Sequence, residues 1–226
     1  MKNPVEFTSS GSNSNMSSAG KRRMSFTSMA GKLHSGLVLT RRASVLAKHM
    51  SDLIPLNARV LDVGCGDGMI DSLIQQTRQD VSLSGIDVMV RPNPGIPVKV
   101  FDGDAIPYPD LSFDVAMFVD VLHHTKDPLR LLKEGYRVAR TMLIKDHLRE
   151  GLFSAQTLRF MDWFGNAHHG VALPYNYWSS NQWDEAFRFL GLTPSKRESS
   201  LGLYPAPLSW IFERKLHFVA TIERSN

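Results

Sequence analysis

The sequence has 226 residues, of which 42% are hydrophobic, and this length suits one domain with a sizeable core. The formal net charge is +4, but the first 50 residues hold eight Lys or Arg and one acid, so residues 51–226 carry 18 bases and 21 acids. A body with more acids than bases disfavours a nucleic-acid partner. The single cysteine excludes a disulfide framework within the chain. Since there is also no span-length apolar stretch or signal sequence, we expect a cytoplasmic protein without integral membrane contact.

Residues 1–30 are rich in Ser, Asn, Gly and Met and have no apolar period, which predicts a disordered tail. The Lys21-Arg22-Arg23 run within it is interpreted as part of a solvated tail. The alternatives are an electrostatic contact with a membrane or a nucleic acid, or a phosphorylation site. Residues 31–226 then form a single domain. It opens with residues 33–54, whose apolar and basic positions recur at helical spacing and predict one or two helices, ended by Pro55.

A short apolar run over residues 60–63 is followed at once by alternating glycines. Its β-branched residues and glycine stop are typical of a buried strand in a parallel sheet. Because glycines have no Cβ atom, Gly64, Gly66 and Gly68 let the backbone turn tightly and approach a ligand closely. The helix predicted over residues 67–79 points its free N–H groups at the same place. These features outline a nucleotide pocket.

The spacing of the glycines favours one class of nucleotide. A pyrophosphate-binding turn has the pattern Gly-x-Gly-x-x-Gly, whereas this chain has Gly-x-Gly-x-Gly beside Asp62 and Asp67, two carboxylates that suit a cofactor carrying a cation. In this motif the chain resembles the class I S-adenosylmethionine-dependent methyltransferases. The resemblance implies S-adenosylmethionine as the cofactor, held at Asp62, Gly64, Cys65, Gly66 and Gly68.

The second strand, predicted over residues 81–87, ends in Asp87. A carboxylate there can accept both ribose hydroxyls of an adenosine, and dehydrogenases also use an acid at this place, so Asp87 predicts a nucleoside without separating the two classes. A third strand is predicted over residues 98–101. The Gly-Asp-Ala segment after it resembles the adenine-binding segment of the same methyltransferases, which implies that Asp104 and Ala105 contact the adenine.

The fourth strand, predicted over residues 113–120, ends in Asp120, which we assign to the cofactor side. Residues 121–128 read Val-Leu-His-His-Thr-Lys-Asp-Pro, which is similar to the small-molecule methyltransferases related to ubiquinone and menaquinone biosynthesis. Asp127 before Pro128 also makes a good helix N-cap. The remaining predicted elements are helices over 130–140 and 182–190, strands over 142–147 and 192–198, and an antiparallel closing strand over 216–222.

Ligands of an open parallel sheet lie beyond the carboxyl ends of its strands. His124 and His147 lie at two such ends. Histidine has a suitable pKa for removing a proton from a hydroxyl or amine that accepts a methyl group. We expect both residues to act as the base or to orient the acceptor. A backbone hydrogen bond or a helix cap is the competing explanation for each.

Residues 148–180 are longer than an ordinary strand-to-helix connection and are interpreted as a substrate-side insertion. The aromatic stripe over residues 153–164 is best explained by packing. Apolar side chains with polar tips suit an acceptor site, and on this ground the substrate-side residues are predicted to be His168, His169, Tyr175 and Tyr177. Adjacent histidines do not face one another on a helix or strand, so no metal is expected.

These patterns predict an α/β fold, a Rossmann-like doubly wound sheet of seven strands, mostly parallel with an antiparallel last strand and with helices on both faces. The expected function is S-adenosylmethionine-dependent methylation of a small-molecule acceptor, at oxygen in preference to carbon or nitrogen. A non-catalytic S-adenosylmethionine-binding module and an NAD-dependent oxidoreductase on a similar fold are the alternatives. The oligomeric state and the identity of the acceptor are left open.

Overall fold

The structure is a computed structural model that describes residues 26–166 and 174–224. The chain divides into two units, Met1–Ser35 and Gly36–Asn226, and the fold described below is that of the second. Helix α1 (Phe26–Leu53) is one helix where the sequence predicted one or two. It begins inside residues 1–30, which the sequence assigned to a disordered tail, because the apolar spacing of Leu33 and Leu37 continues back to Phe26 and Met29.

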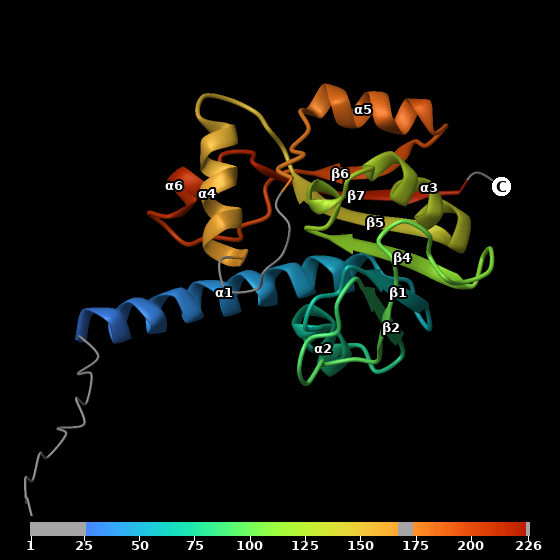
Figure 1. The fold of residues 1–226 in the computed structure, drawn as a ribbon, viewed down its shortest axis with the longest axis horizontal. Helices are drawn as coiled ribbons and strands as arrows, with labels where there is room; N and C mark the ends of the chain where they lie inside the picture. The colour runs from blue at the N-terminus through green and yellow to red at the C-terminus, as the bar shows by residue number, and fades with distance from the viewer. Residues whose placement is uncertain (1–25, 167–173, 225–226) are drawn as a thin grey trace, which may run out of the picture. The chain divides into compact units, whose positions relative to one another are not determined.

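A seven-stranded sheet with the order β3-β2-β1-β4-β5-β7-β6 forms the centre of the second unit (Figure 1). Strands β1 to β5 pair in parallel, and β7 is antiparallel to both of its neighbours, β5 and β6. The predicted doubly wound sheet with an antiparallel last strand is therefore confirmed. The strands are β1 (Arg59–Val63), β2 (Ser82–Asp87), β3 (Val98–Val100), β4 (Phe113–Val119), β5 (Ala139–His147), β6 (Pro194–Glu198) and β7 (His217–Glu223).

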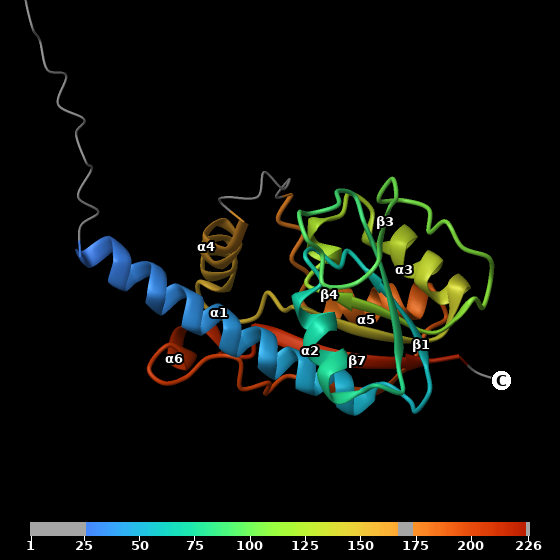
Figure 2. The same ribbon diagram turned by 90° about the horizontal axis from the view of Figure 1, so that it is seen from below.

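Helices cover both faces of this sheet, as predicted (Figures 1 and 2). On one face lie α3 (Pro128–Val138) and α5 (Ser180–Phe189). On the other lie α2 (Met69–Thr77) and the part of α1 that follows Val45. Between residues 26 and 166 and between 174 and 224, none of the helices has both the length and the apolar character needed to cross a bilayer.

Strand β4 shows how the sequence fills both layers. Ala116 and Phe118 join the core cluster that contains α3 and α5, whereas Val115 and Met117 join the cluster that contains α1 and α2. All four side chains are fully buried. Because successive side chains of a strand point to opposite faces, a continuous apolar run is what a strand covered on both sides requires.

The N-caps of the helices set where the loops from strand to helix end. Asp127 caps α3 by accepting the N–H of Arg130, and Pro128 occupies the first turn, as the sequence predicts. Ser179 and Gln182 form a capping box at the start of α5. Since β1, β2, β4 and β5 are parallel, their carboxyl ends open at one edge of the sheet, and the predicted site residues follow those ends.

Candidate cofactor and acceptor site

The glycine turn after β1 has the left-handed backbone that glycine favours. Gly64, Gly66 and Gly68 have φ values of 78°, 61° and 69°. A Cβ at Gly64 would lie 2.5 Å from Val121 Cγ2, so no side chain fits there. A Cβ at Gly66 would meet nothing closer than 3.7 Å, at Arg91 Nε. The turn therefore packs tightly against the end of β4 at its first glycine, whereas at its second a Cβ would only touch the side chain of Arg91.

Cys65 lies between these glycines and is half-buried. Its thiol occupies the space beside Gly85 of β2, where a Cβ would overlap Cys65 Sγ. Burial, followed by the nearby carboxylates, raises the pKa of the thiol above its usual value. The side chain of Cys65 thus packs between the turn and β2.

Two carboxyl groups are buried beneath the turn. Asp62 of β1 and Asp71 of α2 are 3% and 0% exposed, and among the described residues no hydrogen-bond donor reaches Asp62 Oδ1 or either carboxylate oxygen of Asp71. Burial and the neighbouring Asp71 raise the pKa of Asp62 well above its usual value. Burial also raises the pKa of Asp71 to about 6. The pair is therefore held in a partly protonated state, which a nearby cation would reverse.

Asp87 lies where β2 ends, next to the turn. Its Oδ2 accepts the N–H of Gly66 at 2.9 Å, and its Oδ1 accepts the N–H of Met89 at 3.0 Å. Each carboxylate oxygen can accept a further hydrogen bond. The carboxylate thus fixes the second glycine of the turn and can still accept two hydroxyl groups.

The loop after β3 is organised by a residue that the sequence analysis did not single out. Asp102 Oδ1 accepts the N–H groups of both Asp104 and Ala105, each at 2.8 Å, and these bonds hold the pKa of Asp102 below its usual value. Asp104 is paired with Arg130 at 3.4 Å and is half-exposed. Asp102 therefore takes the N–H of Ala105, while the carboxylate of Asp104 stays open to solvent.

Asp120, where β4 ends, is the centre of an ion cluster. Its carboxylate pairs with Arg42 of α1 and with Lys145 of β5. Burial opposes the charge of Asp120, but Lys145 and Arg42 hold its pKa well below the usual value. Asp120 also has a positive φ of 57°. Its predicted place on the cofactor side thus coincides with an anchor between α1 and β5.

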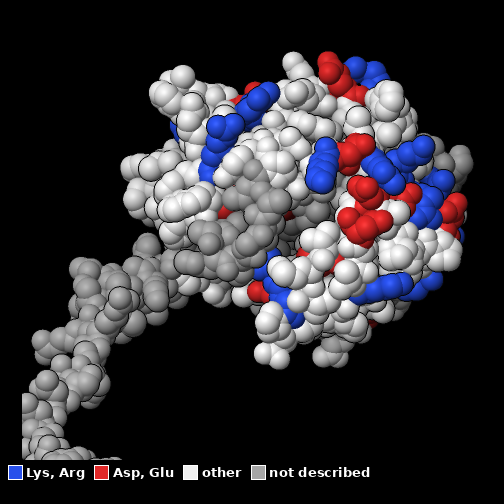
Figure 3. All heavy atoms as spheres, viewed as in Figure 1, with Lys and Arg blue, Asp and Glu red and all other residues white. Residues whose placement is uncertain are grey.

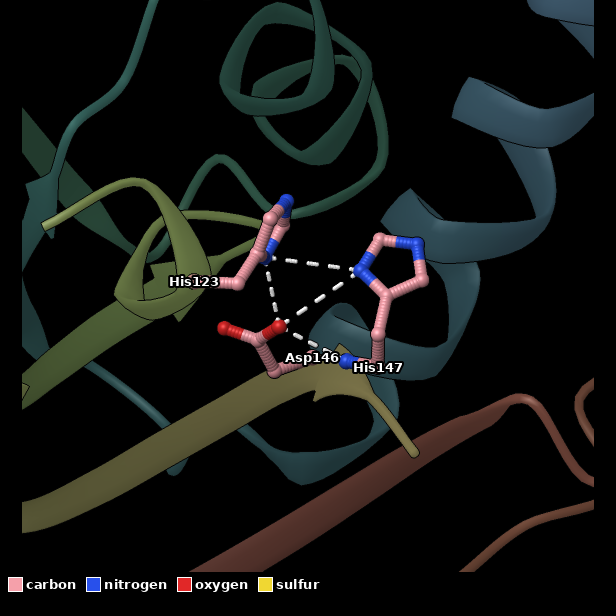
Figure 4. Close-up of side chains that lie close together, drawn as sticks. All are labelled: His123, Asp146 and His147. Atoms are coloured by element: carbon pink, nitrogen blue, oxygen red, sulfur yellow. Dashed lines mark hydrogen bonds and ion pairs between the residues drawn. The ribbon is translucent and has the colours of Figure 1, made fainter. Parts of the chain in front are cut away.

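His123, in the short 3-10 helix η1 (Leu122–His124), is the centre of a second cluster (Figure 4). Its Nδ1 lies 2.6 Å from Asp146 Oδ1 and its Nε2 lies 3.3 Å from Asp162 Oδ2. Burial opposes a charge on His123, but Asp146 and Asp162 raise its pKa to about 10. Tyr177, whose ring stacks on His123, donates its hydroxyl hydrogen bond to Asp162. His123 is therefore an imidazolium that joins β5 to helix α4 (Ser154–Asn166).

The two predicted catalytic histidines adjoin this cluster and are neutral at neutral pH. His147 Nδ1 lies 3.5 Å from Asp146 Oδ1 (Figure 4) and 3.5 Å from Asp120 Oδ1. Burial and Lys145 lower the pKa of His147. Burial and the charge of His123 lower the pKa of His124 to about 4. Among the described residues His124 Nδ1 has no hydrogen-bond partner. Neutral imidazoles can accept a proton or orient a ligand.

Two groups of three residues could hold a metal ion. They are His123 with Asp146 and His147, and His123 with His124 and Asp162. Both need His123 as a neutral ligand, because only deprotonated imidazole binds a metal. Since each ring nitrogen of His123 faces a carboxylate, as the two N–H groups of an imidazolium would, ion pairing within the protein accounts for these groups.

The predicted substrate residues are only partly placed. His168 and His169 lie outside the described residues. Tyr177 is buried and its hydroxyl donates to Asp162, so its side chain belongs to the His123 cluster. Tyr175 is half-buried, with the Arg159 guanidinium 5.4 Å from its ring centre. Of the four, Tyr175 is the one whose described side chain is partly open to solvent.

Several residues that the sequence analysis missed hold the site together: Arg42, Asp71, Asp102, His123, Lys145, Asp146 and Asp162. A signal existed for His123, because it belongs to the same His-His pair as His124, and for Lys145 and Asp146, because charged residues inside an apolar strand need buried partners. Arg42 and Asp162 gave none, since charged residues in amphipathic helices are ordinarily solvated.

The geometry can be compared with known proteins. The profile of a family described as a methyltransferase domain matches residues 38–196. A 27-O-demethylrifamycin SV methyltransferase from Amycolatopsis mediterranei is 29% identical over 110 residues, 42% of this chain and 40% of the relative. A tRNA (carboxymethyluridine(34)-5-O)-methyltransferase from Schizosaccharomyces pombe is 31% identical over 104 residues, 44% and 43% of the two chains. The chain thus spans about two fifths of the length of the curated relatives that it matches.

A solved structure shares the fold. One chain of the complex between the Haloferax volcanii Trm112 methyltransferase activator and a methyltransferase superposes with a TM-score of 0.63 at 19% identity, over 82% of this chain and 91% of that one. At this identity the match speaks for the fold alone.

Proposed function

The chain belongs to the methyltransferase family, in the class I S-adenosylmethionine-dependent group, and from this premise we propose that it transfers a methyl group to the oxygen of a small-molecule acceptor. The observation that carries the proposal is the pair of neutral imidazoles, His124 and His147, beside the carboxyl ends of β4 and β5. Two of the three curated relatives are named for a substrate with an oxygen acceptor, whereas the third, an ajmaline N-methyltransferase from Rauvolfia serpentina that is 32% identical over 117 residues, is named for a nitrogen acceptor. The excess of acids over bases in residues 51–226 favours a small molecule over RNA.

On the cofactor side, the residues present fit S-adenosylmethionine. Gly66 is bordered by the flexible side chain of Arg91, Asp87 offers two carboxylate oxygens for ribose hydroxyls, and Asp62 Oδ1 lacks a donor among the described residues and suits a cation. We assign the backbone of the turn to the same task, together with the exposed carboxylate of Asp104. The full set of proposed cofactor residues is Asp62, Gly64, Cys65, Gly66, Gly68, Asp87, Asp104, Ala105 and Asp120.

On the acceptor side, bound S-adenosylmethionine supplies an electrophilic methyl group, and the protein must position the acceptor and remove its proton. We assign proton removal to His147, because the carboxylates of Asp120 and Asp146 lie 3.5 Å from its Nδ1 and would stabilise the imidazolium that forms. We assign orientation of the acceptor to His124, whose pKa of about 4 makes it a weak base.

Calorimetric titration of the purified protein tests the cofactor assignment. We expect S-adenosylmethionine and S-adenosylhomocysteine to bind and NAD to give no heat of binding. Binding of NAD alone would replace the proposal with an oxidoreductase.

Turnover is tested with a panel of small phenols, carboxylic acids and amines, with formation of S-adenosylhomocysteine as the readout. For an acceptor that is turned over, His147→Asn should lower kcat by about 100-fold or more without weakening cofactor binding, because a positioned base contributes this much. His49→Asn is the matched control, since the described hydrogen bond of His49 Nε2 is donated to Leu201 O and not to a residue of the site. Cofactor binding without turnover of any acceptor class would favour the non-catalytic module, and an unchanged kcat in His147→Asn would exclude His147 as the base.

A further inference from the structure

Two short segments expose most of their large apolar side chains, so the prediction that the aromatic stripe over residues 153–164 packs in the core is wrong for most of its rings. The first is α4 with the residues just before it, and the second is α6 (Ser209–Phe212). The Phe160 and Phe212 rings stack with their centres 6.3 Å apart, and Arg214 Nη2 lies 3.2 Å from Thr157 Oγ1, so the segments form one surface. We call this surface the aromatic face, and its exposed members are Leu152, Phe153, Phe160, Trp163, Phe164, Trp210 and Ile211.

The charges around the aromatic face are basic. Arg159, Arg214 and Lys215 are exposed. The acids of the same segments are turned inward: Asp162 is buried against His123, and Glu213 accepts the N–H groups of Leu203 and Tyr204 at 3.2 and 3.0 Å. In Figure 3 the surface over α4 and α6 is mainly white, with blue spheres beside it and few red ones.

We propose that the aromatic face binds the surface of an anionic lipid bilayer. Contiguous exposed apolar surface of this kind marks an interaction site. Segments that lie in the bilayer interface are rich in Trp and Phe with flanking Lys and Arg. Their rings enter the headgroup region, and their cations bind anionic lipids. A second copy is a poorer occupant, because a self-complementary contact would bring Arg214 and Lys215 close to their own equivalents. The proposal goes beyond the proposed function and does not depend on it.

Co-sedimentation of the full chain with lipid vesicles tests the proposal. The probes are vesicles of phosphatidylcholine alone and vesicles of phosphatidylcholine with phosphatidylserine. We expect the protein to sediment with the anionic vesicles, and the bound fraction to fall as salt is raised, because surface attraction is screened. Trp163 and Trp210 are 56% and 74% exposed, so the tryptophan emission of the unmodified chain should shift to the blue on binding.

The paired variant Trp163→Ser with Trp210→Ser should weaken vesicle binding by about tenfold or more, since each removed ring is buried apolar area in the bound state. Phe189→Ser is the matched control, because Phe189 is 78% exposed on α5, away from the aromatic face, and should bind as the parent does. Arg214→Glu should weaken binding to anionic vesicles alone, with Lys133→Glu on α3 as its control. All of these positions are exposed, and circular dichroism would verify the fold.

Three results would overturn the proposal. One is equal sedimentation with and without anionic vesicles, together with unchanged tryptophan emission. The second is an equal loss of binding in Phe189→Ser, which would show a non-specific apolar effect. The third is a dimer in light scattering that the paired tryptophan variant abolishes, which would assign the face to a second copy of the chain.

Discussion

The proposed cofactor half and the proposed acceptor half of the site are built in different ways. In the cofactor half, one turn of the chain supplies Gly64 to Gly68, and its supports Asp62 and Asp71 lie within a few residues on either side. The acceptor half shares Asp120 with the cofactor side. There Asp120 meets Arg42 from α1 and Lys145 from β5, and His123 meets Asp162 from α4. The first half is a local motif and the second is an assembly of distant charges.

This difference has an energetic meaning. A local turn is fixed mainly by backbone conformation, so the substitutions that it tolerates are those whose residues accept a positive φ. A buried ion network depends on every member, because removing one partner leaves another charge buried and unpaired. We therefore expect single substitutions in the acceptor half to cost more stability. Substitutions in the cofactor half should mainly weaken cofactor binding.

The largest expected effect comes from His123→Gln. It leaves Asp146 and Asp162 without their shared cation, and we expect the free energy of unfolding to fall by about 3–5 kcal/mol. Denaturant unfolding followed by circular dichroism measures it. The neighbouring His124→Gln is the matched control and should cost less than about 1 kcal/mol, since no described partner depends on its Nδ1. Equal losses in the two variants would contradict the ion network.

The pH dependence of His123 has a defined sign. Its folded pKa of about 10 lies above the ordinary histidine value of 6.5, so its contribution to stability is complete below pH 6.5 and is lost as the pH rises through 10. The parent should therefore lose stability over this range more steeply than His123→Gln.

A smaller loss is expected from Gly64→Ala in the cofactor half. The added methyl meets Val121 at 2.5 Å and the residue keeps a φ of 78°, so we expect about 3 kcal/mol of lost stability and no detectable cofactor binding. Gly151→Ala separates the two causes, because Gly151 has a φ of 83° and open space around its Cβ position. If both alanines cost the same in thermal unfolding, the contact with Val121 contributes nothing.

Asp71→Asn should change the pH dependence of stability in the cofactor half. Burial raises the pKa of Asp71 to about 6, so the native pair is favoured at low pH and this stability is lost as the pH rises through 6. The variant should gain up to about 3 kcal/mol over the parent at pH 8 and little at pH 4. Thermal unfolding of both proteins across this range measures the difference. A constant difference at every pH would refute the raised pKa of Asp71.

The smallest effect is expected from Asp87→Ala, which should weaken binding of S-adenosylmethionine by about 1–3 kcal/mol by calorimetry. Asp114→Ala is its control, because Asp114 also accepts a backbone N–H, that of Arg59 at 2.9 Å, but lies where β4 begins. Parent-like affinity in Asp87→Ala would remove Asp87 from the ribose site.

The sequence predicts the fold more completely than it predicts the site. Strand β4 is recognisable because its uninterrupted apolar run has one physical explanation, burial on both faces. The glycine turn is also recognisable, because backbone geometry is the one explanation for the spacing of its glycines. Arg42 and Asp162 are not recognisable, because their partners lie 78 and 39 residues away and an amphipathic helix explains each of them locally. Tyr177 has the right chemistry for a ligand contact, but the chain uses its hydroxyl to hold Asp162.

The position of β7 between β5 and β6 has a consequence for folding. β6 joins the sheet only through β7, and β7 pairs with β5 across about 70 residues, as in the pair His147 and His217. Until β7 inserts, the open edge of β5 presents the apolar run Met142 to Ile144 with unpaired backbone groups, a template for another chain. Such distant pairing forms slowly. Aggregation during refolding should therefore begin at β5, and a peptide with the β7 sequence, added during refolding, should compete for that edge.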